Sequence, residues 1–238
     1  MIFGIILAGG TGSRMNMGNF PKQFMTLCDR PIIIHSLDTF LSCEKFDKIY
    51  LGIHPDWTDH ASELVEKYAY EHKDDIIIIP GGTDRNSSLF NVIEDISARF
   101  GENEEHIIIT HDAVRPFVSL RMIEEGIENA VKYGACATVV PSTDTVVVSH
   151  DGKKIDSMPV RKYLYNEQTP QSFNMMKLKR LYYSLTDEER TGLTDACGIF
   201  TYKGEYVHMA IGDPTNIKIT TASDLAVAEV FMKTRSDE

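Results

Sequence analysis

Hydrophobic residues in this chain gather into short, nearly continuous runs of strand length. The runs are rich in β-branched residues and do not alternate with polar ones, which is typical of strands covered on both faces. Between them lie segments of helical length in which apolar residues recur every three or four positions. The runs predict strands at Ile2–Leu7, Lys48–Ile53, Asp75–Pro80, His106–Thr110 and Cys136–Pro141.

Three of the intervening segments carry recognisable helix ends. The first, Pro31–Cys43, opens with a proline at a plausible first-turn position. The second, Ser87–Phe100, is expected to be capped by Ser87 or Ser88. The third, Ser119–Gly134, begins with a capping serine and ends with a glycine. Later in the chain, helices are predicted at about Met175–Leu185 and Ala222–Thr234, and a short strand at 206–211.

The order of these elements predicts an α/β fold. Strands that alternate with helices form a Rossmann-like, mostly parallel twisted sheet with helices on both faces. After Pro141 the pattern changes, and the sequence DTVVVSHDGKKIDSMPV indicates a β-hairpin that turns at Asp151–Gly152 and projects from the sheet. The sequence contains no internal repeat or linker. We therefore expect residues 1–238 to form a single domain with a projecting β-arm at about 142–170.

Composition narrows the class of protein. The chain has a formal net charge of −11 at pH 7, which argues against binding nucleic acid through a broad basic surface. The apolar N-terminus lacks the basic region of a signal peptide, and no run reaches the roughly 18–20 apolar residues of a membrane span. The four cysteines are scattered without metal-ligand spacing. We expect a cytoplasmic protein that binds neither nucleic acid nor a membrane.

A glycine-rich stretch with two cations follows the first predicted strand. Its sequence, GGTGSRM, fails the dinucleotide fingerprint G-x-G-x-x-G at Met15 and does not fit the P-loop pattern. Glycines there allow backbone N–H groups to approach a ligand closely, and Arg14 and Lys22 add charge suited to a triphosphate. The alternative is a tight strand-to-helix turn with solvated cations.

Charged and hydroxyl side chains also follow the later strands. The carboxyl ends of parallel strands share one edge of a sheet, where ligands bind in open α/β folds. The combination of carboxylates, arginines and glycine turns at that edge predicts a nucleotide-and-metal site. The residues concerned are Asp84, Arg85 and Ser88 after the third strand, Asp112 and Arg115 after the fourth, and Asp144 and Thr145 after the fifth.

Six motifs between residues 5 and 229 resemble, in the same order, those of the cytidylyltransferases that act on polyol phosphates. The motifs are LAGGTGSRM with PKQF, GGTDRNSSL, HDAVRPF, VRKYLYNEQTPQSF, LTDACGIF and TNIKITTASDLAVAE. The family includes enzymes for 2-C-methyl-D-erythritol 4-phosphate and for ribitol 5-phosphate. Ser13 replaces a basic residue that is usual in the methylerythritol enzymes, and the QTPQSF and TDAC motifs also differ from theirs. These differences favour ribitol 5-phosphate.

The resemblance implies that CMP is transferred from CTP to a polyol phosphate, giving a CDP-polyol and pyrophosphate. It also implies Mg²⁺ or another hard divalent cation as cofactor, and a homodimer formed through the β-arm. With D-ribitol 5-phosphate the product is CDP-ribitol. One alternative is 2-C-methyl-D-erythritol 4-phosphate as acceptor, in isoprenoid precursor synthesis. An alternative of another class is a non-catalytic, nucleotide-binding regulatory module.

Roles for individual residues follow from the same resemblance. It implies catalytic roles for Arg14, Lys22 and Lys218, and a metal-ligand role for Asp112. It implies CTP contacts for Ala8, Gly9, Gly10, Gly12, Ser13, Gly82, Asp84, Ser88 and Ala113. It implies acceptor contacts for Arg115, Thr145, Arg161, Thr169 and Asp195, with Arg161 completing the site of a second subunit.

Some of these residues also fit structural roles. Arg85 and Arg115 either contact substrate or only hold nearby carboxylates in ion pairs. Asp195 fits a helix N-cap equally well. We interpret His111 as a hydrogen-bonded structural imidazole and not as a ligand.

Overall fold

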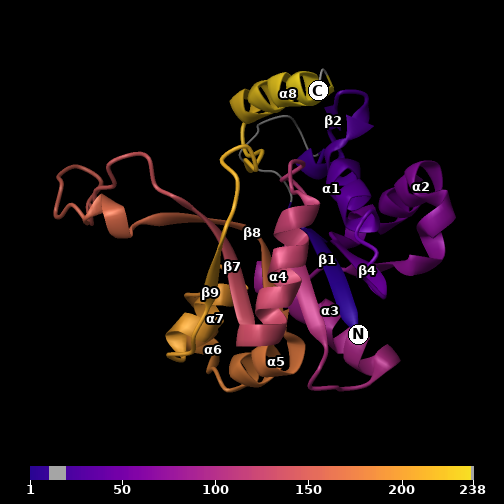
Figure 1. The fold of residues 1–238 in the computed structure, drawn as a ribbon, viewed down its shortest axis with the longest axis horizontal. Helices are drawn as coiled ribbons and strands as arrows, with labels where there is room; N and C mark the ends of the chain where they lie inside the picture. The colour runs from indigo at the N-terminus through magenta and orange to yellow at the C-terminus, as the bar shows by residue number, and fades with distance from the viewer. Residues whose placement is uncertain (11–19, 237–238) are drawn as a thin grey trace.

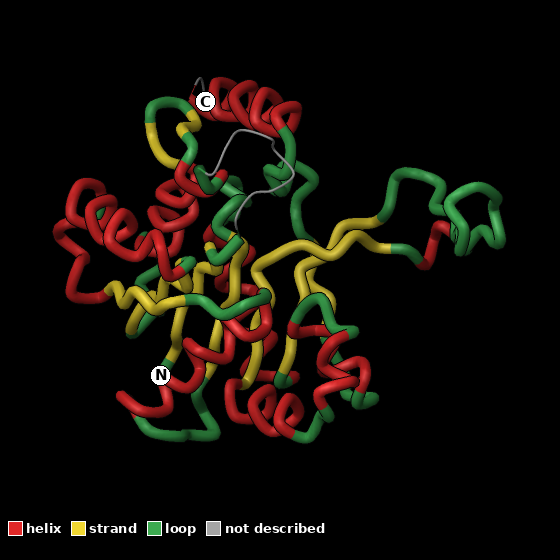
Figure 2. Tube along the Cα trace, turned by 180° about the vertical axis from the view of Figure 1, so that it is seen from behind, coloured by secondary structure: helices red, strands yellow, loops and turns green. Residues whose placement is uncertain are grey.

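The computed structural model describes residues 1–10 and 20–236 and is built on a seven-stranded sheet (Figures 1 and 2). Six strands run parallel, and β8 lies antiparallel between β6 and β7. This confirms the predicted fold class. In sheet order the strands are β5 (Ile76–Pro80), β4 (Lys48–Ile53), β1 (Ile2–Ala8), β6 (Ile107–Asp112), β8 (Tyr165–Asn174), β7 (Ala135–Pro141) and β9 (His208–Ile211).

Helices cover both faces of the sheet because its strands are apolar on both sides. Along β1, Ile6 packs against one helical layer while Ile5 and Leu7 pack against the other. The first layer contains α1 (Ile32–Leu41), α2 (Thr58–Tyr68) and α4 (Leu120–Tyr133). The second contains α3 (Arg85–Phe100), α5 (Met175–Tyr183) and α7 (Ala196–Tyr202), with the short α6 (Asp187–Thr191) preceding α7.

A third, smaller cluster joins the C-terminal helix to the rest of the molecule. Helix α8 (Ala222–Ser236) packs through Ala228 against the small hairpin of β2 (Thr26–Leu27) and β3 (Arg30–Pro31). Ile219, just before this helix, is fully buried in the same cluster. The cluster therefore holds the segment that contains Lys218 against the body of the fold.

The helix ends match the predictions only in part. Pro31, predicted in the first turn, precedes α1 as its N-cap residue. Helix α4 begins at Ser119, whose side chain accepts from the backbone of Met122, and it ends at a left-handed Gly134, as predicted. Helix α3 instead begins two residues earlier than expected, and its cap is Asp84. The prediction of a Ser87 or Ser88 cap was wrong because a carboxylate satisfies the first-turn N–H groups and also suits the positive end of the helix.

Several elements were not predicted, among them α6 and the hairpin of β2 and β3 as well as two larger ones. Helix α2 follows β4, and strand β8 carries buried polar side chains where the sequence suggested part of an arm. The hydroxyl of Thr138 donates to the carbonyl of Pro170 at 2.7 Å, and that of Thr110 donates to the carbonyl of Gln171 at 3.3 Å. Of the polar side chains on β8 itself, Gln168 Nε2 donates to the carbonyl of Asp213 at 2.9 Å and Thr169 Oγ1 accepts from the backbone N–H of Asp112 at 3.1 Å, so hydrogen bonds offset their burial.

The segment 142–164 leaves the sheet between β7 and β8 and extends away from the body (Figure 1). Its predicted turn at Asp151–Gly152 is present, with Asp151 accepting from the backbone of Lys153 at 2.8 Å. The predicted hairpin is reduced to one β-bridge, between Val148 and Ser157. Elsewhere, none of the helices in the described ranges is long and apolar enough to cross a membrane.

Candidate active site

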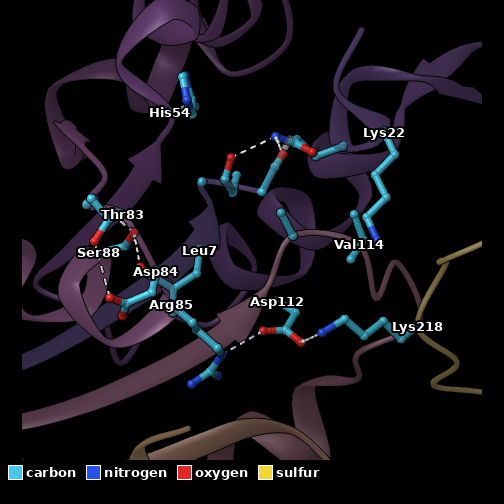
Figure 3. Close-up of a pocket in the computed structure, with 16 residues that line it drawn as sticks. Leu7, Lys22, His54, Thr83, Asp84, Arg85, Ser88, Asp112, Val114 and Lys218 are labelled. Atoms are coloured by element: carbon cyan, nitrogen blue, oxygen red, sulfur yellow. Dashed lines mark hydrogen bonds and ion pairs between the residues drawn. The ribbon is translucent and has the colours of Figure 1, made fainter. Parts of the chain in front are cut away.

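A pocket of about 390 Å³ opens at the carboxyl ends of β1 and β6 (Figure 3). It brings together ten of the residues whose roles were predicted from the sequence, which come from five separate parts of the chain. These are Ala8, Gly9, Gly10, Lys22, Gly82, Asp84, Ser88, Asp112, Ala113 and Lys218. The pocket also contains Arg85, for which the sequence left a substrate contact and an ion pair open, and Leu7, Gln23, His54, Thr83 and Val114, for which no ligand contact was predicted. Gly12, Ser13 and Arg14 lie outside the described residues.

Asp112, at the end of β6, lies among three cations. Its Oδ1 accepts from Arg85 Nε at 3.1 Å and its Oδ2 from Lys218 Nζ at 2.8 Å, while Arg115 Nε lies 3.9 Å from Oδ2. Burial alone would raise the pKa of this carboxyl group, but the neighbouring Arg85, Lys218 and Arg115 outweigh it and hold the pKa far below its usual range. Asp112 is therefore an anion at every pH at which the protein would work.

Lys218 reaches Asp112 because the C-terminal segment is tied to the turn after β6. The backbone N–H of Ile219 donates to the carbonyl of Val114 at 2.9 Å, and Arg115 Nη1 donates to the carbonyl of Asn216 at 2.8 Å. Asn216 is fully buried, and its amide donates in turn to the carbonyl of Thr169 at 2.8 Å. Two residues 106 positions apart in the sequence thus meet in one ion pair.

The glycine turn before α3 is held by its own side chains. The backbone N–H of Gly82 donates to Ser88 Oγ at 3.0 Å, and Ser88 Oγ donates to the carbonyl of Asp84 at 2.8 Å. The Asp84 carboxylate accepts from the backbone of Ser87 at 2.8 Å as the helix cap. A Cβ atom at Gly82 would collide with the Ser87 hydroxyl, so only glycine fits this position without a shift. Both predicted polar side chains, Asp84 and Ser88, are therefore engaged in shaping the turn.

Gln23 anchors the beginning of the N-terminal glycine loop. It follows Lys22 in a short 3-10 helix, Lys22–Phe24, and is almost completely buried. Its Nε2 donates to the carbonyls of Ala8 at 2.7 Å and Gly10 at 3.1 Å. Sequence analysis gave Gln23 no role, although it lies beside Lys22 in the PKQF motif. In the sequence, only its position beside Lys22 marks Gln23, because its burial is visible only in the structure.

The predicted acceptor residues do not line this pocket in a single chain. The Arg115 side chain is partly buried and the Thr169 side chain is buried next to Asp112, whose backbone N–H donates to Thr169 Oγ1 at 3.1 Å. Asp195 caps α7 by accepting from the backbone of Gly198 at 2.8 Å, which agrees with the N-cap interpretation. Thr145 and Arg161 are exposed and do not line the pocket; they belong to the segment 142–164, which extends away from the body of the fold (Figure 1).

His111 is confirmed as a structural residue. It is fully buried, with Nε2 3.0 Å from the carbonyl oxygen of Arg115 and Nδ1 3.0 Å from Thr169 Oγ1. Burial lowers the pKa of its imidazole to about 4, so the ring is neutral near pH 7. It braces the turn after β6 through its contacts with Arg115 and Thr169.

The open, mostly parallel sheet, the glycine turns at its carboxyl edge, and the lysine and two arginines around one buried carboxylate are typical of a nucleotide-using α/β transferase. The family model for 2-C-methyl-D-erythritol 4-phosphate cytidylyltransferase matches residues 2–234, and the chain belongs to that family. The predicted enzyme class, a nucleotidyltransferase that uses CTP, is thereby confirmed.

Relatives with curated names give a closer comparison. Ribitol-5-phosphate cytidylyltransferase of Streptococcus pneumoniae serotype 2 (strain D39 / NCTC 7466) is 49% identical over 98% of this chain and 99% of its own. The enzyme of the same name from strain 70585 is 48% identical over the same shares. Among solved structures, 4-diphosphocytidyl-2C-methyl-D-erythritol synthase from Anaerococcus prevotii DSM 20548 has a TM-score of 0.81 and 28% identity, covering 98% of this chain and 96% of that one.

We expect Gln23→Leu to raise the dissociation constant of CTP about tenfold, because losing buried hydrogen bonds costs on the order of 1–3 kcal/mol. Leucine matches glutamine in size but cannot donate to the carbonyls of Ala8 and Gly10. Isothermal titration calorimetry measures the CTP affinity, and thermal unfolding checks that the variant is folded. A folded variant with wild-type affinity for CTP would show that Gln23 does not position the loop.

Proposed function

We propose that this protein transfers CMP from CTP to D-ribitol 5-phosphate, giving CDP-ribitol and pyrophosphate. The observation that carries the proposal is the 49% identity, over nearly the full length of both chains, to enzymes named ribitol-5-phosphate cytidylyltransferase. The corresponding identity to the methylerythritol synthase of Anaerococcus prevotii is 28%. A difference of this size favours the ribitol acceptor.

A second acceptor has its own support. The family model that matches the chain carries the name of the 2-C-methyl-D-erythritol 4-phosphate enzyme, and so do solved structures with the same fold. Both acceptors are polyol phosphates and would meet the same set of cations. A non-catalytic regulatory module is disfavoured because Lys22, Asp112 and Lys218 are all present in one pocket.

The chemistry proposed for the site is an in-line substitution at the α-phosphorus of CTP. A phosphate oxygen of the acceptor forms the new O–P bond, and the bond from the α-phosphorus to the bridging oxygen of pyrophosphate breaks. The phosphate monoester is already ionised near neutral pH, so no general base is required. Both reactants are anions, and catalysis then consists of positioning and neutralisation of charge.

The cations of the pocket divide between donor and acceptor in this proposal. Lys22 extends into the pocket beside the N-terminal glycine loop (Figure 3), and we assign it, with Arg14, to the triphosphate and its α-phosphorus. Lys218 and Arg115 both lie at Oδ2 of Asp112, and we assign them to the acceptor phosphate. The positive charge that now surrounds Asp112 would then be shared with the substrates.

The cytidine is assigned to the turn at residues 81–84. Ala8, Gly9, Gly10 and Ala113 form the adjoining wall of the pocket. Because the side chains of Asp84 and Ser88 are occupied within the turn, base recognition would fall to backbone groups that they hold in place. A rigid, backbone-lined slot suits the amino and carbonyl edges of a pyrimidine.

The donor set around Asp112 fits Mg²⁺. The described residues contain no group of three or more His, Cys, Asp or Glu side chains able to hold a metal, so a metal here would take Asp112 as its one carboxylate ligand. Mg²⁺ is commonly bound by one or two carboxylates together with substrate phosphates and water. We propose that Asp112 holds Mg²⁺ or another hard divalent cation. When bound, the ion would offset the repulsion between the phosphates.

The projecting segment supports a homodimer. Its exposed apolar side chains would be covered by a second copy of the chain; they are Val146, Val147, Val148, Ile155, Met158, Val160 and Tyr163. We propose that residues 1–238 form one domain whose arm, at about 142–170, crosses to the partner and brings Thr145 and Arg161 to its acceptor site.

We also propose that the reaction occurs in the cytoplasm, in keeping with four free cysteines.

The acceptor is tested by measuring pyrophosphate release with CTP and Mg²⁺. We expect D-ribitol 5-phosphate to give a kcat/KM at least about a hundredfold above that of 2-C-methyl-D-erythritol 4-phosphate, a difference of roughly 3 kcal/mol in transition-state binding. The reverse preference would assign the protein to the second acceptor. Absence of turnover with both would contradict the proposed reaction.

Dimeric sharing of the site is tested by mixing inactive variants. If Arg161 acts in the partner's site, co-expressed Lys22→Ala and Arg161→Ala chains form heterodimers with one intact site, and about one quarter of the wild-type activity returns in a two-fold symmetric dimer. The control pairs Lys22→Ala with Lys218→Ala, which damage each chain's own site and restore nothing. Equal inactivity of both mixtures would contradict the shared site.

A further inference from the structure

Arg85 connects two parts of the pocket that the proposed function assigns to different ligands. It is the first residue of α3, directly after the cap Asp84, and so belongs to the glycine turn. Its side chain crosses the pocket to the end of β6, where Nε donates to Asp112 Oδ1 at 3.1 Å (Figure 3). One side chain therefore links the turn assigned to the cytidine with the carboxylate assigned to the metal.

The far end of Arg85 is anchored on β8. Its Nη2 donates to Gln171 Oε1 at 3.1 Å, and Gln171 Nε2 donates to Glu167 Oε1 at 2.6 Å. The amide of Gln171 thus offers its oxygen to a guanidinium and its nitrogen to a carboxylate, an arrangement that the reversed amide could not make. Gln171 is 2% exposed, which leaves its side chain little freedom to move.

The three cations around Asp112 are held to different degrees. The Lys218 side chain is 38% exposed, and its ammonium group donates to a single carboxylate oxygen, Oδ2. The Arg85 side chain is 21% exposed and cannot leave Oδ1 without also disturbing Gln171. The contact between Lys218 and Oδ2 is therefore exchanged for a ligand more easily than the contact between Arg85 and Oδ1.

The pairing of Arg85 is incomplete. Its Nη1 is buried and has no hydrogen-bond partner in the described part of the chain. A buried donor without a partner destabilises the folded state, because it has lost its hydrogen bonds to water. The protein tolerates that cost at a position where a lysine would carry the same charge but could not make the two-directional contact.

We infer that Arg85 is a positioning residue for the reaction, which holds Asp112 through Oδ1 and ties it to the turn at residues 81–84. The inference rests on the proposed function only for the identities of the two ligands, CTP and a divalent cation. It has a thermodynamic consequence. Binding of CTP at the turn and binding of the cation at Asp112 strengthen each other, and this coupling depends on Arg85.

The test compares Arg85→Lys with a matched arginine on the same helix. Arg99 pairs with Asp95 on the exposed surface at the other end of α3, and Arg99→Lys serves as the control. Calorimetry measures the dissociation constant of CTP with and without Mn²⁺, used as the probe cation. We expect Arg85→Lys to change the dissociation constant of CTP without metal less than about threefold. The gain in CTP affinity on adding Mn²⁺, here called the Mn²⁺-dependent gain, should fall at least about tenfold. Arg99→Lys should alter neither quantity.

A second variant, Gln171→Leu, tests the inference independently in case Arg85→Lys does not fold. Gln171→Leu removes the anchor and keeps Arg85, so it should reduce the Mn²⁺-dependent gain in the same direction. The double variant Arg85→Lys with Gln171→Leu should be little worse than Arg85→Lys alone, because the two residues act in series. Turnover should fall about ten- to a hundredfold in Arg85→Lys, with a higher Mg²⁺ concentration needed for half-maximal rate.

Three outcomes would overturn the inference. If Arg85→Lys lowered the CTP affinity without metal as much as it lowered the Mn²⁺-dependent gain, Arg85 would be a direct contact of CTP. An unchanged gain in folded variants would make it a structural ion pair only. If the effects of Arg85→Lys and Gln171→Leu on the Mn²⁺-dependent gain were fully additive, Gln171 would not act by holding Arg85 in place. The binding measurements need no polyol phosphate, so they remain decisive if the proposed acceptor proves wrong.

Discussion

The burial of one carboxylate among three cations is the constraint on which the site depends. Asp112 is 7% exposed, and an ionised group in that position is tolerable only when it is paired. Its partners come from the start of α3, from the turn after β6 and from the C-terminal segment. Removing one partner from a buried ion pair typically costs about 3–5 kcal/mol, so these three regions are held together by the carboxylate they share.

The reversed strand β8 supplies the other half of this arrangement. Because it lies between β6 and β7, it places Thr169 against the backbone of Asp112 and Gln171 against Arg85. The projecting segment leaves the sheet after β7 and rejoins it at the start of β8. The part of the fold that braces Asp112 is thus continuous with the arm that, in the proposed dimer, reaches the partner's acceptor site. Donor binding and acceptor binding would share one structural element.

Much of the fold was predictable because apolar runs mark buried parallel strands. Strands β1, β4 and β5 lie within one residue of their predicted bounds. Strand β8 was missed because it carries buried polar side chains such as Gln168 and Thr169, whose hydrogen bonds to distant parts of the chain the local pattern cannot reveal. The pocket residues were identified through a resemblance in short motifs. Contacts such as Lys218 with Asp112 or Gln23 with Ala8 depend on segments that meet only in the folded chain.

The most direct test of this account is the effect of Asp112→Asn on the coupling between Mg²⁺ and CTP. Asparagine preserves the shape of the side chain and removes the charge that holds the three cations. We predict that the variant binds CTP without metal about as well as the wild type, gains no affinity from Mg²⁺, and turns over about a hundred- to a thousandfold more slowly. A folded variant that keeps both the Mg²⁺-dependent gain and wild-type turnover would contradict the central role of Asp112.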